Sequence, residues 1–327
     1  MAAINLLQAV NETLRQEMKR DSRVVVFGED VGYEGGVFRA TADLQKEFGK
    51  DRCMDSPLAE SAIVGVGIGM AINGMIPVVE MQFCGFVYPA FNQIISHVAR
   101  MRNRSRGRYT LPMVIRMPYG GGIRALEHHS ESPEAFFAHI PGLKVVVPST
   151  PYDTKGLLAA AIRDEDPVIF LEPKRIYRAF KQEVPEEEYI IPIGKAKAVK
   201  EGEDITLVSW GAMMRETLKA AELAEAEGIY AEVIDLRTIA PIDRETVINS
   251  VKKTGRVIVV HEAPKTGGVG GELMAIINEK AFLHLEAPPT RVTGFDTPFP
   301  LPRGEQHYLP SPERIMVKIR ELVNYLT

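Results

Sequence analysis

The stretch formed by residues 55–70 constrains the fold of this chain more than any other, because the backbone pattern changes around one isolated carboxylate. Pro57 disfavours helix in the residue before it, so residues 52–55 are expected to end a strand. After Glu60 the apolar residues follow the spacing of a buried helix instead of the alternation of a strand. Glu60 is therefore predicted to lie at a strand-to-helix corner, at the amino-terminal end of a tightly packed helix.

This helical run carries three glycines, Gly65, Gly67 and Gly69, at alternate positions. Each glycine costs about 1 kcal/mol in a helix interior relative to alanine, so we expect another backbone to pack closely against this helix. A nucleotide-binding loop is a different interpretation of the same glycines, but that motif requires Gly-x-Gly-x-x-Gly after a strand. Met70 occupies the last position here, and the glycines lie inside the helical run, so we reject that interpretation.

Chain length and net charge limit the number of domains and the kinds of partner that we expect. The chain has 327 residues, which suggests about two domains, and its 45% hydrophobic content is sufficient for large cores. The net charge of −4 gives no global basic footprint, so no nucleic-acid partner is expected.

The cysteine count and the terminal sequence indicate a compartment. Cys53 and Cys84 are too few for a disulfide framework and suggest a reducing environment. The sequence shows no signal peptide, no Arg-rich transit segment and no apolar run long enough to cross a membrane. We therefore expect a soluble cytoplasmic protein without membrane contact.

Helical and strand patterns alternate through the chain in two blocks. Continuous apolar runs such as residues 23–27 and 144–147 are typical of strands buried on both faces of a parallel sheet. Residues 181–203 are charged, contain prolines and show weak periodicity, so they are predicted to form a linker. The fold class predicted is α/β, with two open, mostly parallel domains formed by residues 1–180 and 204–327.

Polar groups follow successive predicted strands of the first domain: Glu60, then Gln82 with Phe86 after it, then His129. Ligands of open α/β sheets bind beyond the carboxyl ends of the strands, so these groups predict a site. Each also has a structural explanation. Glu60 would suit the helix dipole, Gln82 could satisfy backbone groups, Phe86 could belong to the core, and a loop histidine such as His129 could be solvated.

A series of alternating arginines has a simple structural explanation. Arginines alternate along a predicted helix end and loop, at Arg100, Arg102, Arg104, Arg106 and Arg108. A solvated, partner-facing surface is favoured there over a phosphate-binding patch.

Glycines also cluster at residues 267–271, before a predicted helix. Such a cluster resembles an anion nest, but no Lys or Ser/Thr pattern of a phosphate loop accompanies it, so a tight turn or an interface contact is favoured. The sequence has no Cys-x-x-Cys, His-Glu-x-x-His or Gly-x-Ser-x-Gly motif, which leaves structural zinc, zincin and serine hydrolase chemistry without support.

Short motifs along nearly the whole chain resemble one family. They are Gly28-Glu-Asp-Val-Gly, Gly35-Gly-Val-Phe, Asp55-Ser-Pro-Leu-Ala-Glu-Ser, Glu80-Met-Gln-Phe, Pro118-Tyr-Gly-Gly-Gly, Pro141-Gly-Leu-Lys-Val-Val, Ser149-Thr-Pro-Tyr-Asp, Ala161-Ile-Arg-Asp-Glu-Asp-Pro-Val and Asp235-Leu-Arg-Thr. As a set they are similar to the beta subunit of the thiamine-diphosphate-dependent decarboxylating component of 2-oxo acid dehydrogenase complexes. The resemblance implies a pyrimidine-binding domain followed by a domain like the transketolase C-terminal domain.

The resemblance also implies roles for the predicted site. Glu60 matches the glutamate that contacts the aminopyrimidine ring nitrogen of thiamine diphosphate, where a carboxyl group can donate a proton and so activate the cofactor. Phe86 matches the aromatic residue stacked near the pyrimidine, and Leu58 and Gln82 match positions that line the pocket. His129 matches the active-site histidine that assists transfer of the acyl group to lipoamide.

A structural potassium site is implied as well. The matching positions are Met113, Ala161, Ile162, Asp164 and Asp166, through main-chain carbonyls and a carboxylate. The magnesium-diphosphate motif of the family, Gly-Asp-Gly followed by Asn-Asn, does not occur in this chain. In the family the alpha subunit carries it and holds magnesium.

The resemblance therefore implies an assembly. It predicts a heterotetramer of two alpha and two beta subunits, with this chain supplying the pyrimidine half of the site. The second domain is expected to make beta–beta contacts and to dock to the lipoyl acyltransferase core.

The preferred substrate is predicted from the segment after Phe86. Residues 88–94 resemble bacterial branched-chain enzymes, and Pro89 stands where pyruvate-type relatives often carry an acidic residue. A branched-chain 2-oxo acid is therefore predicted, with pyruvate as the alternative. Two other classes remain open. One is a one-chain synthase of the transketolase or deoxyxylulose type, against which the missing motif argues. The other is a non-catalytic assembly subunit, which would not need Glu60 and His129.

Overall fold

The computed structural model describes residues 1–325, which form two compact units. The first unit contains residues 1–119 and 136–193, and the second contains residues 120–135 and the chain from Gly194 onward. Each unit is built on its own mostly parallel sheet with helices packed against it, so the predicted α/β class is confirmed.

The sheet of the first unit has the strand order β6-β7-β5-β4-β2-β3, and all of these pairs are parallel. The strands are β2 (Val24–Gly28), β3 (Cys53–Asp55), β4 (Ile76–Glu80), β5 (Val114–Tyr119), β6 (Lys144–Val146) and β7 (Val168–Pro173). Their apolar side chains are almost entirely buried, as expected for strands covered on both faces. Because the strands are parallel, their carboxyl ends meet at one edge of the sheet.

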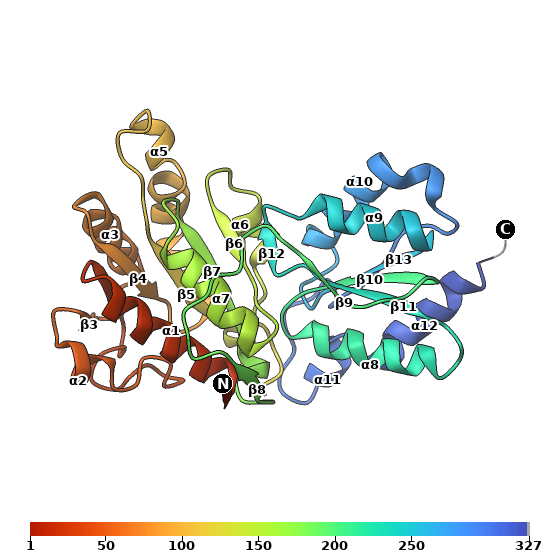
Figure 1. Ribbon diagram of the computed structural model, residues 1–327, viewed down its shortest axis with the longest axis horizontal. Helices are drawn as coiled ribbons and strands as arrows, with labels where there is room; N and C mark the ends of the chain where they lie inside the picture. Colours follow the sequence, from red (N-terminus) through yellow and green to blue (C-terminus); the bar gives the residue numbers. More distant parts are fainter. Residues whose placement is uncertain (326–327) are drawn as a thin grey trace. The chain divides into compact units, whose positions relative to one another are not determined.

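Helices cover this sheet (Figure 1). The α-helices are α1 (Leu6–Arg20), α2 (Leu44–Phe48), α3 (Glu60–Ile72), α4 (Phe91–Gln93), α5 (Met101–Arg104), α6 (Glu134–Ala138) and α7 (Pro151–Ile162). Helix α1 begins with a capping box, in which Asn5 and Gln8 each bond the backbone N–H of the other. Its buried face packs against α7.

Residues 88–102 are mostly helical, but they do not form one continuous α-helix. The chain instead forms a 3-10 helix (Cys84–Ala90), the short α4, a π-helix (Ile94–Val98) and then α5. Pro89 lies inside the 3-10 helix, where it has no N–H to donate. Single π turns of this kind often accompany functional sites.

The second unit has the strand order β14-β13-β10-β11-β9, in which only the β11–β9 pair is antiparallel. The strands are β9 (Lys197–Lys200), β10 (Ile205–Ser209), β11 (Ala231–Asp235), β13 (Val257–Val260) and β14 (Thr290–Val292). Helices α8 (Met213–Glu225) and α12 (Pro312–Val323) pack together on one face, and α9 (Arg244–Thr254) and α10 (Val269–Ala281) on the other (Figure 1).

The segment predicted to be a linker, residues 181–203, contains short strands. Strand β1 (Ala2–Ile4) pairs with β8 (Gln182–Val184), and β9 lies on the edge of the second sheet, so residues 181–203 contain two strands. The remaining elements are β12 (Thr238–Ala240) and α11 (Glu305–Tyr308). The predicted domain limits, 1–180 and 204–327, stay a prediction.

The glycines of α3 behave differently from one another. A Cβ atom added to Gly67 would lie 3.0 Å from the side chains of Val79 and Met113, so close packing requires a small residue there. No atom lies within 4 Å of such a Cβ at Gly69, and only Gln93 reaches 4.0 Å at Gly65. Within residues 1–325, therefore, no other backbone makes the expected close approach to these three glycines.

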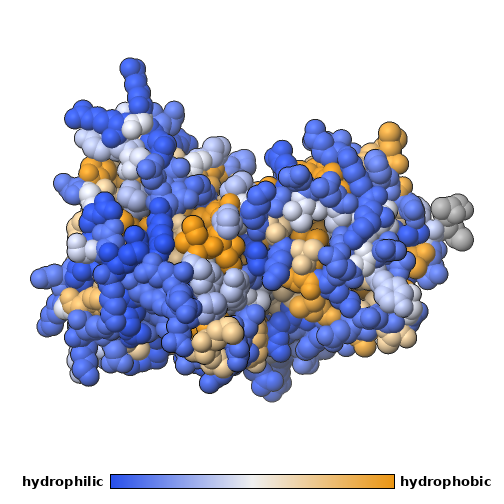
Figure 2. All heavy atoms as spheres, in the orientation of Figure 1, coloured by the Kyte–Doolittle hydropathy of each residue, from blue (hydrophilic) through white to orange (hydrophobic). Residues whose placement is uncertain are grey.

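The surface and the cysteines complete the description. The face drawn in Figure 2 is mostly hydrophilic, with small, separate apolar patches. No helix in the described part of the chain is both long enough and apolar enough to cross a bilayer. Cys53 and Cys84 are both buried, and no disulfide joins them within residues 1–325.

Candidate active site

Glu60 lies where the sequence predicts it, at the corner between a strand and a helix. Strand β3 ends at Asp55, and Glu60 is the first residue of α3. The next residue, Ser61, donates a hydrogen bond to the carbonyl of Pro89, which ties the first turn of α3 to the 3-10 helix. The Glu60 side chain is half-buried and so stays accessible to a ligand.

Two further carboxyl groups lie beside Glu60. Burial raises the pKa of Glu29, and the nearby charges of Asp30 and Glu60 raise it further. Gln82 Nε2 donates a hydrogen bond to Asp30 Oδ2 at 3.0 Å, so Gln82 does not serve to satisfy the backbone. These residues follow β2, β3 and β4, so they lie at the same edge of the sheet of the first unit, and a ligand site there stays a prediction.

Sequence reasoning missed Glu29 and Asp30 as members of this group. The motif that begins at Gly28 directly follows a buried strand, and that position was the available signal. We call Glu29, Asp30, Glu60 and Gln82 the acidic cluster.

Two phenylalanines, Phe83 and Phe86, come shortly after Gln82 in the sequence, and contacts between aromatic rings hold them in place. The Phe86 ring centroid lies 5.5 Å from that of Phe83, which in turn lies 5.4 Å from Phe38, both in edge-to-face geometry. Phe86 is half-buried, so part of its ring can contact a ligand. Leu58 is 72% exposed, and its role as a pocket wall stays a prediction.

A buried ion cluster joins the neighbouring strands β4, β5 and β7. Arg116 donates to Glu80 at 2.6 Å and to both oxygens of Glu172 at 2.6 and 3.0 Å. Tyr177 donates its hydroxyl to Glu172 at 2.6 Å. Burial alone would lower the pKa of Arg116, but the two carboxylates outweigh it and raise that pKa. Every member is paired, so this cluster is structural, although Glu80 is only two residues from Gln82.

His129 belongs to the second unit. It ends a 3-10 helix (Glu127–His129) within residues 120–135, a segment that we call the histidine strap. His129 is half-buried, whereas the side chain of its neighbour His128 is 47% exposed and lies 3.7 Å from Glu131. The acidic cluster lies in the first unit, so a common site with His129 stays a prediction.

Carboxylates of the second unit hold the histidine strap. Gly121 N–H donates to Glu262 at 2.9 Å, and Arg124 N–H donates to Glu305 at 3.1 Å. Gly120 has a φ of +81°, and an added Cβ there would lie 2.5 Å from the Glu262 carboxylate. The strap is therefore fixed at its start by close contacts that only glycine permits.

Glu134, near the end of the strap, is fully buried. Neither carboxyl oxygen has a hydrogen-bond partner, and burial raises the pKa of Glu134 to about 8. The charge of Glu262 raises it further, and the nearby Trp210 indole opposes this only in part. Glu134 is therefore held mostly protonated at neutral pH, unlike a surface carboxyl.

The carbonyls predicted to hold potassium partly suit that ion. The Met113 carbonyl accepts the N–H of Val168 at 3.0 Å, and the Ala161 carbonyl accepts that of Asp164 at 3.4 Å. A carbonyl oxygen has two lone pairs, so the Met113 carbonyl keeps one for a cation, whereas the Ala161 carbonyl also accepts the N–H of Arg163. Ile162 is the last residue of α7.

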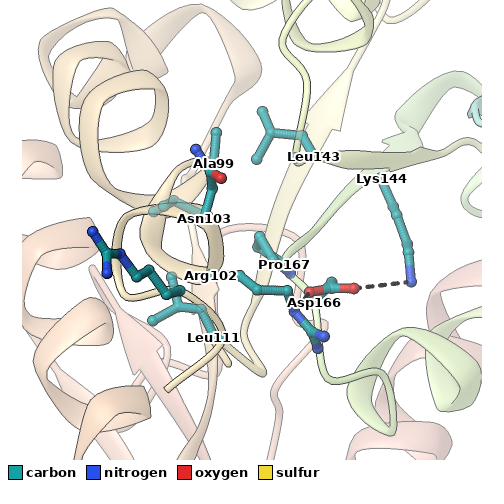
Figure 3. Close-up of a pocket in the computed structure, with 12 residues that line it drawn as sticks. Ala99, Arg102, Asn103, Leu111, Leu143, Lys144, Asp166 and Pro167 are labelled. Carbon is teal, nitrogen blue, oxygen red and sulfur yellow. Dashed lines mark ion pairs between the residues drawn. The ribbon is translucent and has the colours of Figure 1, made fainter. Parts of the chain in front are cut away.

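The carboxylates of this set already have cationic partners. Lys144 Nζ lies 2.6 and 2.7 Å from the two Asp164 oxygens. It also lies 3.8 Å from Asp166, the ion pair drawn in Figure 3. Arg102 lies 2.7 Å from Asp166. A potassium ion here would therefore depend on main-chain carbonyls more than on carboxylates. Within residues 1–325 no group of three or more His, Cys, Asp or Glu side chains is arranged to hold a metal.

A cavity of about 760 Å³ adjoins this region (Figure 3). Its lining includes Leu111, Lys144 and Pro167, which lie at the amino ends of β5, β6 and β7. The acidic cluster lies at the carboxyl ends of the same sheet. The cavity is therefore at the opposite edge of the sheet and is not part of the candidate site.

Comparison with known families matches both halves of the chain. Residues 2–179 match the family "Transketolase, pyrimidine binding domain", and residues 194–315 match "Transketolase, C-terminal domain". The acidic cluster, Phe86 and the histidine strap all lie within the first match.

Curated relatives are similar over nearly the full length. The chain is 63% identical over 322 residues to the "Pyruvate dehydrogenase E1 component subunit beta" of Acholeplasma laidlawii, covering 98% of each chain. Two Bacillus subtilis proteins are also similar, and each alignment covers 99% of this chain and 100% of the relative. "Pyruvate dehydrogenase E1 component subunit beta" is 52% identical, and "2-oxoisovalerate dehydrogenase subunit beta" is 50% identical.

A solved structure shares the fold. The protein described as "Split gene transketolase, inactive beta4 tetramer" superposes with a TM-score of 0.79, covering 98% of this chain and 99% of its own. At 23% sequence identity this likeness supports the two-domain transketolase fold and nothing further.

Proposed function

Because the chain belongs to the family of beta subunits of 2-oxo acid dehydrogenase E1 components, we propose that it works with an alpha subunit to decarboxylate a 2-oxo acid and transfer the acyl group to lipoamide. One observation carries the proposal. The acidic cluster stands at the carboxyl ends of the strands, inside the segment that matches the pyrimidine-binding domain.

The acidic cluster suits the aminopyrimidine of thiamine diphosphate. That ring offers amino and ring-nitrogen groups to carboxylates and a flat face to an aromatic side chain. Glu60 would hold a proton at the ring nitrogen, Gln82 would line the pocket beside it, and Phe86 would contact the ring. When bound, the cofactor supplies the carbon nucleophile and the electron sink that decarboxylation requires.

The alpha subunit is proposed to hold magnesium and the diphosphate group, because this chain lacks the corresponding motif. Helix α3 offers a surface for such a partner. Ala62, Gly65, Val66 and Gly69 are exposed or half-exposed, at the spacing of one helix face. Small residues allow another backbone to approach closely, so this face would accept a helix of a partner subunit in the proposed heterotetramer of two alpha and two beta chains.

His129 is proposed to act in the second half-reaction. Reduction of the lipoyl disulfide requires a proton donor at sulfur, and the imidazole group of a histidine can fill that role near neutral pH. Glu262 and Glu305 position the strap that carries His129 through the N–H groups of Gly121 and Arg124.

Three further parts of the prediction remain proposals. Potassium would bind at the carbonyls of Met113 and Ala161, and the second unit would dock to the lipoyl acyltransferase core. The protein would work in the reducing cytoplasm, where the buried thiols of Cys53 and Cys84 would stay free.

The substrate is a small 2-oxo acid, and two candidates have support. Relatives named for pyruvate and for 2-oxoisovalerate are both similar to this chain, at 52% and 50% identity in one organism. Pro89 is the observation that favours a branched-chain acid, because it stands where pyruvate-type relatives often carry an acidic residue. Its carbonyl accepts a hydrogen bond from Ser61, the residue next to Glu60, so this position is close to the proposed site. The ratio of kcat/KM values for the two acids in the assembled enzyme decides between them.

The experiment that tests the proposal is reconstitution. The chain is expressed alone and with its alpha partner, and both are assayed with thiamine diphosphate, magnesium and an artificial electron acceptor. Activity is expected only with alpha. Comparable activity of the chain alone would support a one-chain synthase instead, and inactivity of every assembly would support a non-catalytic subunit.

A further inference from the structure

A second cavity, of about 440 Å³, lies within the second unit, between β14, α12 and the loop before α10. Its volume falls in the range of about 300–1,000 Å³ that is usual for small-molecule sites. Four basic side chains line it, those of Lys265, Arg291, Arg314 and Lys318, against one acidic residue, Asp296. No role proposed above uses this cavity.

Arg314 is fixed in place without being neutralised. Its Nη atoms donate to the main-chain carbonyls of Thr293, Tyr308 and Leu309 at 2.7, 3.0 and 3.1 Å. Its guanidinium lies 4.7 Å from the centroid of the Phe295 ring. Neutral carbonyls and an aromatic face hold the group rigidly and leave its full positive charge available.

Arg291 is also without a carboxylate partner. One of its Nη atoms donates to the Lys265 carbonyl at 2.9 Å, and its buried Nε has no hydrogen-bond partner. Within residues 1–325, neither Arg291 nor Arg314 forms an ion pair. The Asp296 carboxylate instead accepts the N–H and the hydroxyl of Thr266, both at 2.8 Å.

The cavity of the first unit gives a contrast. There Arg102 lies 2.7 Å from Asp166, and Lys144 lies 2.6 Å from Asp164, so two basic side chains have their own carboxylates. In the second unit only Lys318 has one, Glu321, which is outside the cavity lining. The excess positive charge is thus a property of the second cavity and not of basic residues in general.

We propose that the cavity between β14 and α12 binds a small organic phosphate. Guanidinium groups match phosphate oxygens in a bidentate fork, and Arg291 and Arg314 would supply these donors. The lysines would add charge at the rim. The apolar part of the ligand would contact Phe295 and Val317, each of which is 50% exposed.

The test is isothermal titration of the full-length chain with phenyl phosphate, which has both a phosphoryl group and an apolar ring. Saturating thiamine diphosphate and magnesium are present throughout, so that any site for a cofactor diphosphate is already filled. We expect a dissociation constant below about 1 mM, weaker binding of inorganic phosphate, and a loss of affinity as salt is raised.

Paired variants separate the cavity from general surface charge. Lys265→Ala with Lys318→Ala removes two lining charges and is expected to weaken phenyl phosphate binding at least tenfold. Lys252→Ala with Lys280→Ala removes two exposed lysines outside the cavity and is expected to change binding less than twofold. Neither pair alters the buried core, and circular dichroism checks that both fold.

Three results would overturn the proposal. They are no binding of phenyl phosphate at millimolar concentration, equal weakening in both double variants, and binding of an acidic peptide in place of the phosphate. None of these outcomes bears on the decarboxylase proposal, because that site is defined by other residues and assayed by other means.

Discussion

Glu60 and Glu80 are two glutamates of the same sheet edge with opposite environments. Glu80 ends β4, is only 4% exposed, and accepts a hydrogen bond from the Arg116 guanidinium at 2.6 Å. Glu60 begins α3, is half-buried, and has no such cation beside it in the described chain; instead its charge acts on the carboxyl group of Glu29. The difference separates a carboxylate used by the fold from one left for a ligand.

The two glutamates also need different surroundings. A buried carboxylate is tolerated only when cations and hydrogen bonds surround it, and Arg116 and Tyr177 supply these around Glu80 and Glu172. Glu29 has no such cation within the described residues, so burial raises its pKa, and repulsion from the charges of Asp30 and Glu60 raises it further. Such a group is stabilised when a ligand donates hydrogen bonds to it, and repulsion of this kind is common at functional sites.

The largest expected effect is on activity, from Glu60→Gln. The amide cannot supply a carboxyl proton to the cofactor, so the rate of hydrogen–deuterium exchange at its C2 position should fall by about 100- to 10,000-fold in the reconstituted enzyme. The melting temperature should hardly change, because Glu60 supports no buried contact. Glu34→Gln, at an exposed position, is the control. Normal exchange in the Glu60 variant would make this glutamate a structural residue like Glu80.

The next effect is on stability, from Arg116→Leu. Removing the guanidinium leaves Glu80 and Glu172 buried without their cation, so the free energy of unfolding should fall by about 3–5 kcal/mol. Urea denaturation measures this change. Arg23→Leu removes an exposed partner of Asp21 and should have little effect. Adding Glu80→Gln and Glu172→Gln to the Arg116 variant should restore part of the loss. Full stability of the single variant would contradict the structural role.

The comparison extends to the second unit through His129 and His128. His129→Ala should slow acylation of the lipoyl domain about 100-fold or more, and leave decarboxylation with an artificial acceptor nearly intact. His128→Ala is the matched control, because its side chain is exposed and lies near Glu131. Equal rates of acylation in wild type and His129→Ala would assign the histidine a structural role only.

Glu134 provides a third environment, a buried carboxyl with no cation. Its pKa is raised to about 8, so between about pH 4.5 and 8 the folded protein binds a proton that the unfolded chain has released. Stability therefore falls as pH rises through this window, by up to roughly 1.4 kcal/mol per pH unit. Glu134→Gln cannot ionise and should remove this slope from unfolding curves measured at pH 5 to 8.

The control for this prediction lies on the same strap. Glu127→Gln changes an exposed carboxyl and should leave the pH dependence as in wild type. An unchanged slope in Glu134→Gln would mean that water or a counter-charge reaches the buried carboxyl.

Local sequence predicts the parts of this site that depend on local structure. The Pro57 break and the helical spacing after Glu60 are sufficient to place that residue at a strand-to-helix corner. The alternation of elements likewise predicts mostly parallel sheets in two units. The changes of helix type within residues 88–102 have a local cause too, since helical periodicity alone does not reveal a π turn or the effect of Pro89.

The sequence does not reveal contacts that depend on which strands lie side by side in a sheet. Arg116 stands in an apolar run, and only the order β4-β5-β7 places it between Glu80 and Glu172. The same is true of the histidine strap, since Gly121 and its partner Glu262 are 141 residues apart in the chain. No periodicity or motif spacing connects positions so far apart.

The smallest effect tests how the buried ion cluster shares its charge, through Tyr177→Phe. Burial and the charge of Glu172 raise the pKa of Tyr177, so its hydroxyl stays protonated and donates to that carboxylate at 2.6 Å. Hydrogen bonds to charged groups contribute about 1.5–3 kcal/mol, and the low end is expected because Arg116 still binds both oxygens of Glu172.

Tyr189→Phe is the matched control for this change. Its hydroxyl donates to the neutral carbonyl of Tyr152 at 2.7 Å, a bond that contributes about 0.5–1.5 kcal/mol. Urea denaturation should therefore rank Tyr177→Phe as the more destabilising of the two. If the two variants are equal, the Arg116 fork already neutralises Glu172, and the cluster tolerates loss of its outer member. If Tyr177→Phe costs as much as Arg116→Leu, the hydroxyl is as necessary as the cation.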